Sequence, residues 1–215
     1  AGVLGANDGI VSVAAIVVGV AGATSSVAPL ITAGVAGLVG GAISMALGEY
    51  VSVSSQSDSQ RALIEKERRE LAEMPDEELA ELAAIYESKG ISSATARQVA
   101  EELTRHDALS AHLEAELGIT ERDVVSPWQA AGASALAFTI GGVLPLAAIL
   151  LVPEPIRVLA TFIAVLSALV VTGALSARVG GNSWVRPTLR IVIGGALALA
   201  TTFLIGTLLG TTGVV

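Results

Sequence analysis

The sequence predicts an all-α integral membrane protein with five transmembrane helices and a polar helical domain inserted between the second and the third. Three observations predict this fold class. The 215 residues are 53% hydrophobic, with a mean hydropathy of +0.72. Only 15% of them are charged, whereas a soluble domain carries about a quarter. Most of the charge is confined to one stretch, because residues 58–123 hold 17 acidic and 8 basic side chains.

The first two spans are predicted as a helical hairpin within residues 1–54. Residues 9–48 are uncharged, and these 40 residues are too many for one crossing of a roughly 30 Å hydrocarbon core and about right for two. The break is expected at residues 24–29, which end in a proline suited to the first turn of a helix. The first apolar run lacks the basic segment that opens a signal peptide, so it is predicted as a span. The two spans are therefore placed at residues 8–23 and 29–53.

A domain of acidic helices is predicted at residues 55–125, where helical periodicity replaces the apolar runs. Pro75 interrupts it and Gly118 ends it. The net charge of −9 between residues 58 and 123 argues against nucleic acid as a partner and favours cations. Helices are expected at residues 60–74, at 76–88, from Ser92 or Ser93 to Glu102 or beyond, and at 107–117.

Three further spans are predicted within residues 126–215. Trp128 precedes the first of them, at a position typical of an interfacial aromatic residue. A Pro-Glu-Pro turn at residues 153–155 separates it from the next. The absence of cysteine excludes a disulfide framework and a thiolate metal site. The three spans are placed at residues 129–152, 158–177 and 191–215.

The membrane orientation is predicted from the short loop that contains Arg178, Arg186 and Arg190. Basic loops face the cytoplasm, so this loop is expected there. Counting spans places the acidic domain and the start of the chain on the cytoplasmic side as well. The predicted location is a bacterial plasma membrane, or a vacuolar membrane if the source is eukaryotic.

Three side chains at the cytoplasmic end of the hairpin are candidate metal ligands: Asp8, Met45 and Glu49. Met45 and Glu49 are four residues apart and therefore share a helix face. A carboxylate with a thioether suits a borderline-soft cation such as Fe²⁺, whereas Mg²⁺ and Ca²⁺ prefer oxygen alone. Two plainer interpretations stay open: Met45 as ordinary apolar filling and Asp8 as a helix N-cap.

The acidic domain offers a second set of candidate ligands on successive helices. Glu67 and Glu70 are three residues apart, as are Glu78 and Glu81 beyond Pro75, so each pair lies on one helix face. Antiparallel packing would bring the two faces together into a cluster that a cation would stabilise. His112 and Glu116, four residues apart, could complete it. The alternative is a solvated acidic surface.

The chain resembles the vacuolar iron transporter family through several strings in the same order. These are residues 5–9 (GANDG), residues 41–50 (GAISMALGEY), the paired glutamates of the acidic domain, and residues 116–118 (ELG). The resemblance covers essentially the whole chain. One departure concerns the last acidic helix, where the resemblance implies methionine and this sequence has His112 and Leu113. Imidazole suits Fe²⁺, Mn²⁺, Zn²⁺ and Co²⁺ alike.

The resemblance implies a homodimer of five-span subunits that moves Fe²⁺ out of the cytosol in exchange for protons. It also implies a path at the dimer interface lined by the first span, with Asp8 and Met45 as ligands. The acidic domain would gather metal through Glu67, Glu70, Glu78, Glu81 and Glu116. Divalent metal, protons, lipid and a second copy are thus the expected partners.

The function predicted from these features is that of a secondary transporter, not an enzyme, with no resident cofactor. A membrane-tethered di-iron ferroxidase or iron store is the alternative. Such a site uses Glu-x-x-His pairs, and neither histidine follows a glutamate by three residues. A structural membrane protein with an acidic interaction domain is the third interpretation. It leaves the grouping of Asp8, Met45 and Glu49 unexplained.

Overall fold

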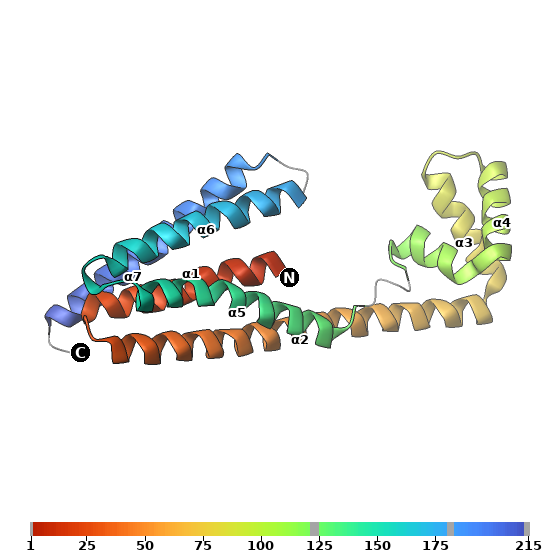
Figure 1. Ribbon diagram of the computed structural model, residues 1–215. Coiled ribbons are helices and arrows are strands. Elements are labelled where there is room, and N and C mark those ends of the chain that lie inside the picture. Colours follow the sequence, from red (N-terminus) through yellow and green to blue (C-terminus); the bar gives the residue numbers. More distant parts are fainter. Residues whose placement is uncertain (1, 121–124, 180–182, 213–215) are drawn as a thin grey trace. The chain divides into compact units, whose positions relative to one another are not determined.

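The computed structural model describes residues 2–120, 125–179 and 183–212. Within these ranges the regular structure is helical and contains no strand (Figure 1). Five of the helices, α1, α2, α5, α6 and α7, are long and apolar enough to cross a membrane, as predicted. In chain order the elements are α1 (Gly2–Ala23), α2 (Val27–Glu73), α3 (Pro75–Ser88), α4 (Ser93–His112), the π-helical turn η1 (Leu113–Leu117), α5 (Pro127–Leu151), the 3₁₀ turn η3 (Glu154–Ile156), α6 (Arg157–Val179) and α7 (Val185–Thr211).

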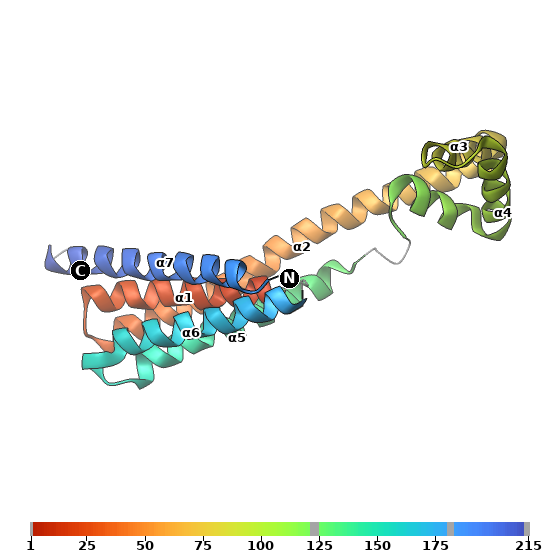
Figure 2. The ribbon, with the colours of Figure 1, turned by 90° about the horizontal axis from the view of Figure 1, so that it is seen from above.

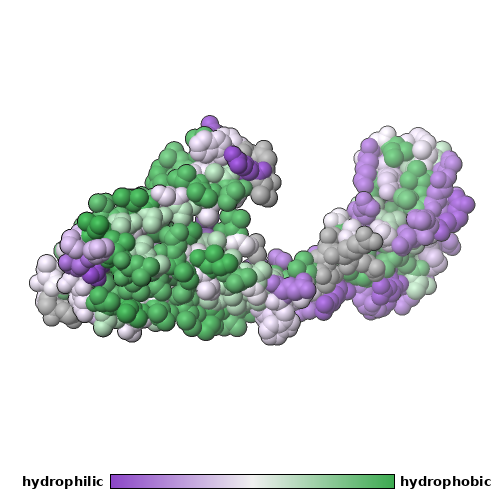
Figure 3. All heavy atoms as spheres, viewed as in Figure 1, coloured by the Kyte–Doolittle hydropathy of each residue, from purple (hydrophilic) through white to green (hydrophobic). Residues whose placement is uncertain are grey.

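Contacts divide the chain into two units, each described here by itself. The membrane unit comprises Ala1–Tyr50 and Trp128–Val215, and the polar unit comprises Val51–Pro127. Helix α2 contributes its first part to the membrane unit and the rest to the polar unit. Apolar side chains cover most of the visible face of the membrane unit, and hydrophilic ones much of that of the polar unit (Figure 3).

Helix α1 lies at the centre of the membrane unit, with the other helices around it (Figures 1 and 2). One apolar cluster joins it to α6 and α7 through Ala14, Leu169 and Leu199. A second cluster joins it to α2 and α5 through Val17 and Phe138, among others. Seven residues of α1 are buried, and 39% of its membrane window is buried, a larger share than in the other four candidate spans. This helix therefore forms the core of the unit.

Close helix contact in the membrane unit depends on glycine at specific positions. At Gly206 of α7, a Cβ atom would lie 1.8 Å from the carbonyl oxygen of Gly19 in α1. A methyl group there must push the two helices apart. Gly194, on the same helix, has no neighbouring atom within 4 Å of the corresponding position.

We therefore expect Gly206→Ala to destabilise the membrane unit by about 1–3 kcal/mol or more, the usual cost of overpacking. Gly194→Ala is the matched control, and its stability should be equal or slightly higher because alanine favours the helix. Thermal denaturation of the full-length proteins in detergent measures the difference. Equal melting temperatures for the two variants would contradict the close packing of α1 and α7.

The polar unit is built from short helices with well-defined ends. Pro75 occupies the first position of α3, where its missing N–H costs no hydrogen bond. The Ser92 hydroxyl caps α4 by accepting a hydrogen bond from the Thr95 amide. The left-handed φ of +63° at Gly118 ends η1. Side chains buried in this unit include Ile64, Leu82, Ala96, Ala100 and Leu113.

The last two helices predicted for this domain differ from those observed. The structure has a single helix α4 up to His112, with non-helical backbone angles at Asp107. The Asp107 carboxylate accepts a hydrogen bond from the Ser110 amide at 3.0 Å, so it caps the second segment as an N-cap residue does. The predicted start at Asp107 is thus a kink rather than a break. The predicted end, residues 113–117, widens into the π-helical turn η1.

Candidate metal-binding sites

Four predicted ligands meet inside the polar unit, one from each of its helical segments. Glu67 comes from α2, Glu78 from α3, His112 from the end of α4 and Glu116 from η1. The Nδ1 atom of His112 lies 3.0 Å from Oε1 of Glu67 and 3.5 Å from Oε2 of Glu78. Donor atoms of Glu67, His112 and Glu116 all lie within 4.8 Å of one another. We refer to these four residues as the carboxylate–histidine cluster.

The cluster has a buried side and an exposed side. Glu67 is 2% exposed, Glu78 5% and His112 0%, while Glu116 is exposed. Oε1 of Glu67 and both ring nitrogens of His112 are buried. Although Nδ1 and Oε1 lie 3.0 Å apart, their orientation is not that of a hydrogen bond, so none of the three atoms has a hydrogen-bond partner among the described residues. Buried polar atoms without partners are costly. A cation bound between them would remove that cost, and Glu116 marks the side from which it would enter.

The protonation of the cluster reflects burial and mutual repulsion. Burial raises the pKa of Glu67 to about 7, and the charges of Glu116, Glu78 and Glu70 add to this effect. Burial also raises the pKa of Glu78, with Glu81 as the next contributor. The pKa of His112 is lowered by burial. The imidazole is therefore neutral at pH 7, which is its metal-binding form.

Glu70 and Glu81 lie outside this group of four but act on it electrostatically. The negative charge of Glu81 contributes to the raised pKa of Glu78 and opposes the lowering of that of His112. Glu70 forms an ion pair with Lys66, with 2.7 Å between Nζ and Oε2. Sequence reasoning missed Lys66, although its spacing of four residues from Glu70 was a visible signal.

The other set of candidate ligands meets in part, in a cavity of the membrane unit of about 460 Å³ between α1, α2 and α5. Asp8 of α1 and Met45 of α2 both line it. Glu49, one turn beyond Met45, is not among the residues that line it. Asp8 lies inside α1, in its second turn, so it is not an N-cap.

Two hydroxyl groups in this cavity escaped the sequence analysis. The Ser12 hydroxyl donates a hydrogen bond to Oδ1 of Asp8 at 3.0 Å. Ser44 lines the same cavity beside Met45. The spacing of four residues between Asp8 and Ser12 was a signal that could have been noticed. With these hydroxyls the cavity offers a carboxylate, a thioether and neutral oxygens, a donor set that fits a borderline-soft divalent cation.

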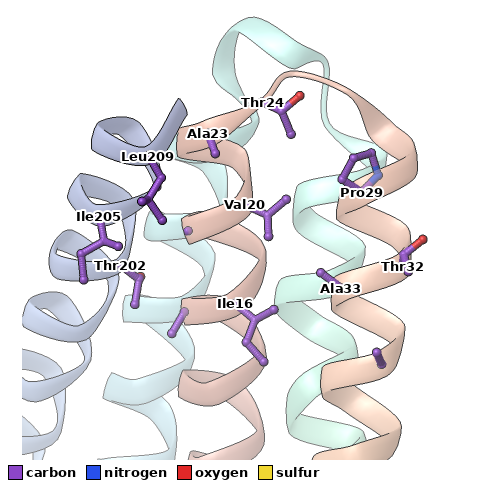
Figure 4. Close-up of a pocket in the computed structure, with 14 residues that line it drawn as sticks. Ile16, Val20, Ala23, Thr24, Pro29, Thr32, Ala33, Thr202, Ile205 and Leu209 are labelled. Atoms are coloured by element: carbon purple, nitrogen blue, oxygen red, sulfur yellow. The ribbon is translucent and has the colours of Figure 1, made fainter. Parts of the chain in front are cut away.

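A larger groove of about 650 Å³ lies between α1, α2 and α7, near the turn that joins α1 to α2 (Figure 4). Its 14 lining residues include no charged side chain. The polar side chains among them are the threonines Thr24, Thr32 and Thr202. An apolar lining of this kind cannot replace the hydration shell of a cation. The groove is therefore not a candidate ion site.

Comparison with known proteins finds matches over nearly the whole chain. The model of the VIT family matches residues 1–207. The chain belongs to the VIT family. A protein named "Vacuolar iron transporter", from Acanthamoeba castellanii, is 41% identical over 207 residues, which cover 96% of this chain and 76% of that protein. "Vacuolar iron transporter homolog 2" from Arabidopsis thaliana is 36% identical over 214 residues, covering 99% and 85%. "Vacuolar iron transporter 2" from Oryza sativa subsp. japonica is 32% identical over 204 residues, covering 94% and 83%.

Membership in the VIT family confirms the resemblance seen in the sequence. The names of these relatives are those of transporters and not of enzymes, as predicted. Together with the five apolar helices, they identify a multi-pass membrane protein that transports metal.

Proposed function

We propose that this protein is a secondary transporter that exports Fe²⁺ from the cytosol in exchange for protons. The observation that carries the proposal is the cavity among the transmembrane helices where Asp8 meets Met45. An ionisable side chain at such a position is costly and marks an ion path. The relatives named as iron transporters support iron as the metal.

In this proposal the carboxylate–histidine cluster collects metal before transport. Its donor atoms are close enough to share one ion, and its neutral imidazole needs no proton loss to bind. Glu70 and Glu81 would increase the local concentration of cations through their charge. Because imidazole and carboxylate suit several divalent ions, Mn²⁺, Zn²⁺ and Co²⁺ are further candidate substrates.

Coupling to protons would occur at Asp8. A carboxylate in a low-dielectric cavity is most stable when it is neutralised either by a cation or by a proton. The hydrogen bond from Ser12 holds the Asp8 carboxylate in place during this exchange. Met45 would bind the metal without competing for protons, because a thioether is not basic. Release of metal on one side would thus follow protonation of Asp8.

We further propose that two copies assemble into a homodimer through α2. This helix exposes apolar side chains at intervals of four residues. Such a row forms a ridge that winds slowly around the helix, because four residues turn it by slightly more than one full circle. Of the α2 window long enough to span a membrane, only 11% is buried within one subunit. A second copy packed along this ridge would cover exposed apolar side chains and enclose the cavity beside it. The ridge consists of Val27, Ile31, Val35, Val39, Ile43, Leu47 and Val51.

The proposed orientation places the polar unit in the cytosol. Arg178 at the end of α6 and Arg186 and Arg190 at the start of α7 flank the connection between these two helices. The positive-inside rule assigns this connection to the cytoplasm. Asp8 and Met45 then lie in the cytoplasmic half of the bilayer. A bacterial plasma membrane remains the proposed host membrane, with a vacuolar membrane as its eukaryotic counterpart.

The proposal is tested with the purified protein in liposomes under anaerobic conditions. Fe²⁺ is added outside, while an iron-quenched fluorophore and a pH-sensitive dye are trapped inside. We expect Fe²⁺ entry to raise the internal pH, because each metal ion that enters displaces protons outward. Protein-free liposomes show the passive leak of both ions.

Iron entry without any pH change would contradict the exchange for protons. Absence of iron entry, together with oxygen consumption on adding Fe²⁺ in air, would instead support the tethered ferroxidase.

A further inference from the structure

Lys66 is the first feature of the polar unit that the proposed function leaves unexplained. It directly precedes the buried Glu67, and its Nζ atom lies 2.7 Å from Oε2 of Glu70. The charges of Glu116 and Glu67 also act on the ammonium group. Two further ion pairs of this unit, Arg68–Glu65 and Arg97–Glu101, join carboxylates that do not belong to the cluster or its flanking glutamates.

The Lys66–Glu70 pair is poorly suited to a purely structural role. Its side chains are 57% and 27% exposed, and exposed pairs of this kind contribute little to stability. Lysine also precedes glutamate by four residues, which is the less favourable order along a helix. Stability of α2 alone therefore does not account for a lysine among these acidic groups.

We propose that Lys66 is a built-in counter-cation that competes with metal at the carboxylate–histidine cluster and so sets its affinity. Without metal, the ammonium group offsets part of the mutual repulsion of Glu67, Glu70 and Glu116. When a divalent ion binds between Glu67, His112 and Glu116, it repels the ammonium group. This repulsion, or the displacement of Lys66 that relieves it, makes the free energy of metal binding less favourable. This inference rests on the proposed metal-binding role of the cluster.

Such competition suits a collecting site in a transporter. A cluster of three carboxylates and one imidazole without a positive neighbour would hold a divalent ion tightly and release it slowly. The tethered ammonium group weakens binding and speeds release, so collected metal stays exchangeable. Lys66 is thus an affinity-tuning residue rather than a ligand, because an ammonium group has no free lone pair.

The experiment measures Mn²⁺ binding to the full-length protein in detergent, in an Asp8→Asn background that impairs the membrane site. Lys66→Gln removes the charge and keeps a similar chain length. We expect it to bind Mn²⁺ roughly fivefold more tightly at low ionic strength, the effect of one charge on a doubly charged ion through water-like screening. The gain should shrink towards zero at about 1 M salt, where the Debye length is about 3 Å.

Two controls make the result specific to Lys66. Arg97→Gln removes the same charge from the same unit, at an ion pair with Glu101, and should change the affinity less than twofold. Lys66→Arg keeps the charge and should bind like the parent protein. Circular dichroism verifies that each variant is helical.

The outcomes separate this inference from the proposed function. Equal or weaker Mn²⁺ binding by Lys66→Gln than by the parent at low salt would overturn the role of Lys66 while leaving the cluster as a metal site. An equal gain in Mn²⁺ affinity for Arg97→Gln would show that the effect depends only on the net charge of the protein, and it would also overturn the role of Lys66. No Mn²⁺ binding by the parent would overturn the metal-collecting role of the cluster and the role of Lys66 with it.

Discussion

Replacing Asp8 with asparagine is expected to reduce Fe²⁺ entry into liposomes roughly 100-fold or more and to remove its dependence on pH. Loss of one partner from a buried charge pair costs about 3–5 kcal/mol, and each 1.4 kcal/mol or so is a factor of ten in rate. The asparagine side chain has the same shape and can still accept the hydrogen bond that Ser12 donates to Asp8. The variant therefore removes the charge and the exchangeable proton and little else.

A matched control removes one carboxylate elsewhere in the membrane unit. Glu154 begins the turn η3, beyond the end of α5, and is exposed. Glu154→Gln should transport Fe²⁺ at the parental rate with the parental pH dependence. If Asp8→Asn also transported Fe²⁺ at the parental rate with the parental pH dependence, the proposal that Asp8 exchanges protons would be wrong. Loss of transport with an unchanged pH dependence of the residual flux would assign Asp8 to metal binding alone.

The second large effect is expected for Glu67→Gln, and its sign depends on metal. Without metal at pH 8, the polar unit should be more stable in the variant than in the parent, because the variant lacks the buried negative charge of Glu67. With metal, the polar unit should be less stable in the variant than in the parent. Losing a charged ligand at a buried site lowers metal affinity roughly 100-fold. A surface residue would not show such a reversal.

The pH dependence follows from the raised pKa of Glu67. Its folded-state pKa is about 7 against an ordinary 4.5. The stability it contributes is fully present below pH 4.5 and is lost as the pH rises through about 7. At about 1.4 kcal/mol per pKa unit, the metal-free parent should lose up to about 3 kcal/mol relative to Glu67→Gln over this range. The two proteins should be equally stable near pH 4.

His112 affects the pH dependence of stability in the opposite direction to Glu67. Its lowered pKa contributes stability that is present above its ordinary value of 6.5 and is lost as the pH falls. Because Nδ1 of His112 lies 3.0 Å from Oε1 of Glu67, the two groups titrate as a coupled pair. The prediction therefore concerns the difference between the two proteins above pH 6.5, where the imidazole is neutral in both. Hydrogen exchange of the α3 and α4 peptides in the full-length protein measures that difference locally.

Glu65→Gln is the control for this experiment. Glu65 lies two residues before Glu67 on α2, its side chain is 62% exposed, and it pairs with Arg68. Its replacement should alter exchange by less than about 0.5 kcal/mol at every pH, with or without metal. A difference between Glu67→Gln and the parent that does not change with pH would contradict the raised pKa.

The sequence alone determined the features of this protein that depend on local pattern and composition. The five apolar helices, the confinement of charge to one segment and the helix ends at Pro75 and Gly118 follow from such signals. The strings that identify the family are local as well. Local signals suffice here because hydrophobic length, helix-breaking residues and capping act within a few residues of one another.

Only the tertiary structure decided which candidate ligands meet. Glu67 and His112 are far apart in the chain and come into contact because α2, α3 and α4 pack around a small core. Asp8 and Met45 share a cavity while Glu49 does not line it. The glutamates of the acidic domain look alike in sequence. Burial distinguishes Glu67 and Glu78 from their exposed neighbours. It results from packing between helices, which a local sequence pattern does not encode.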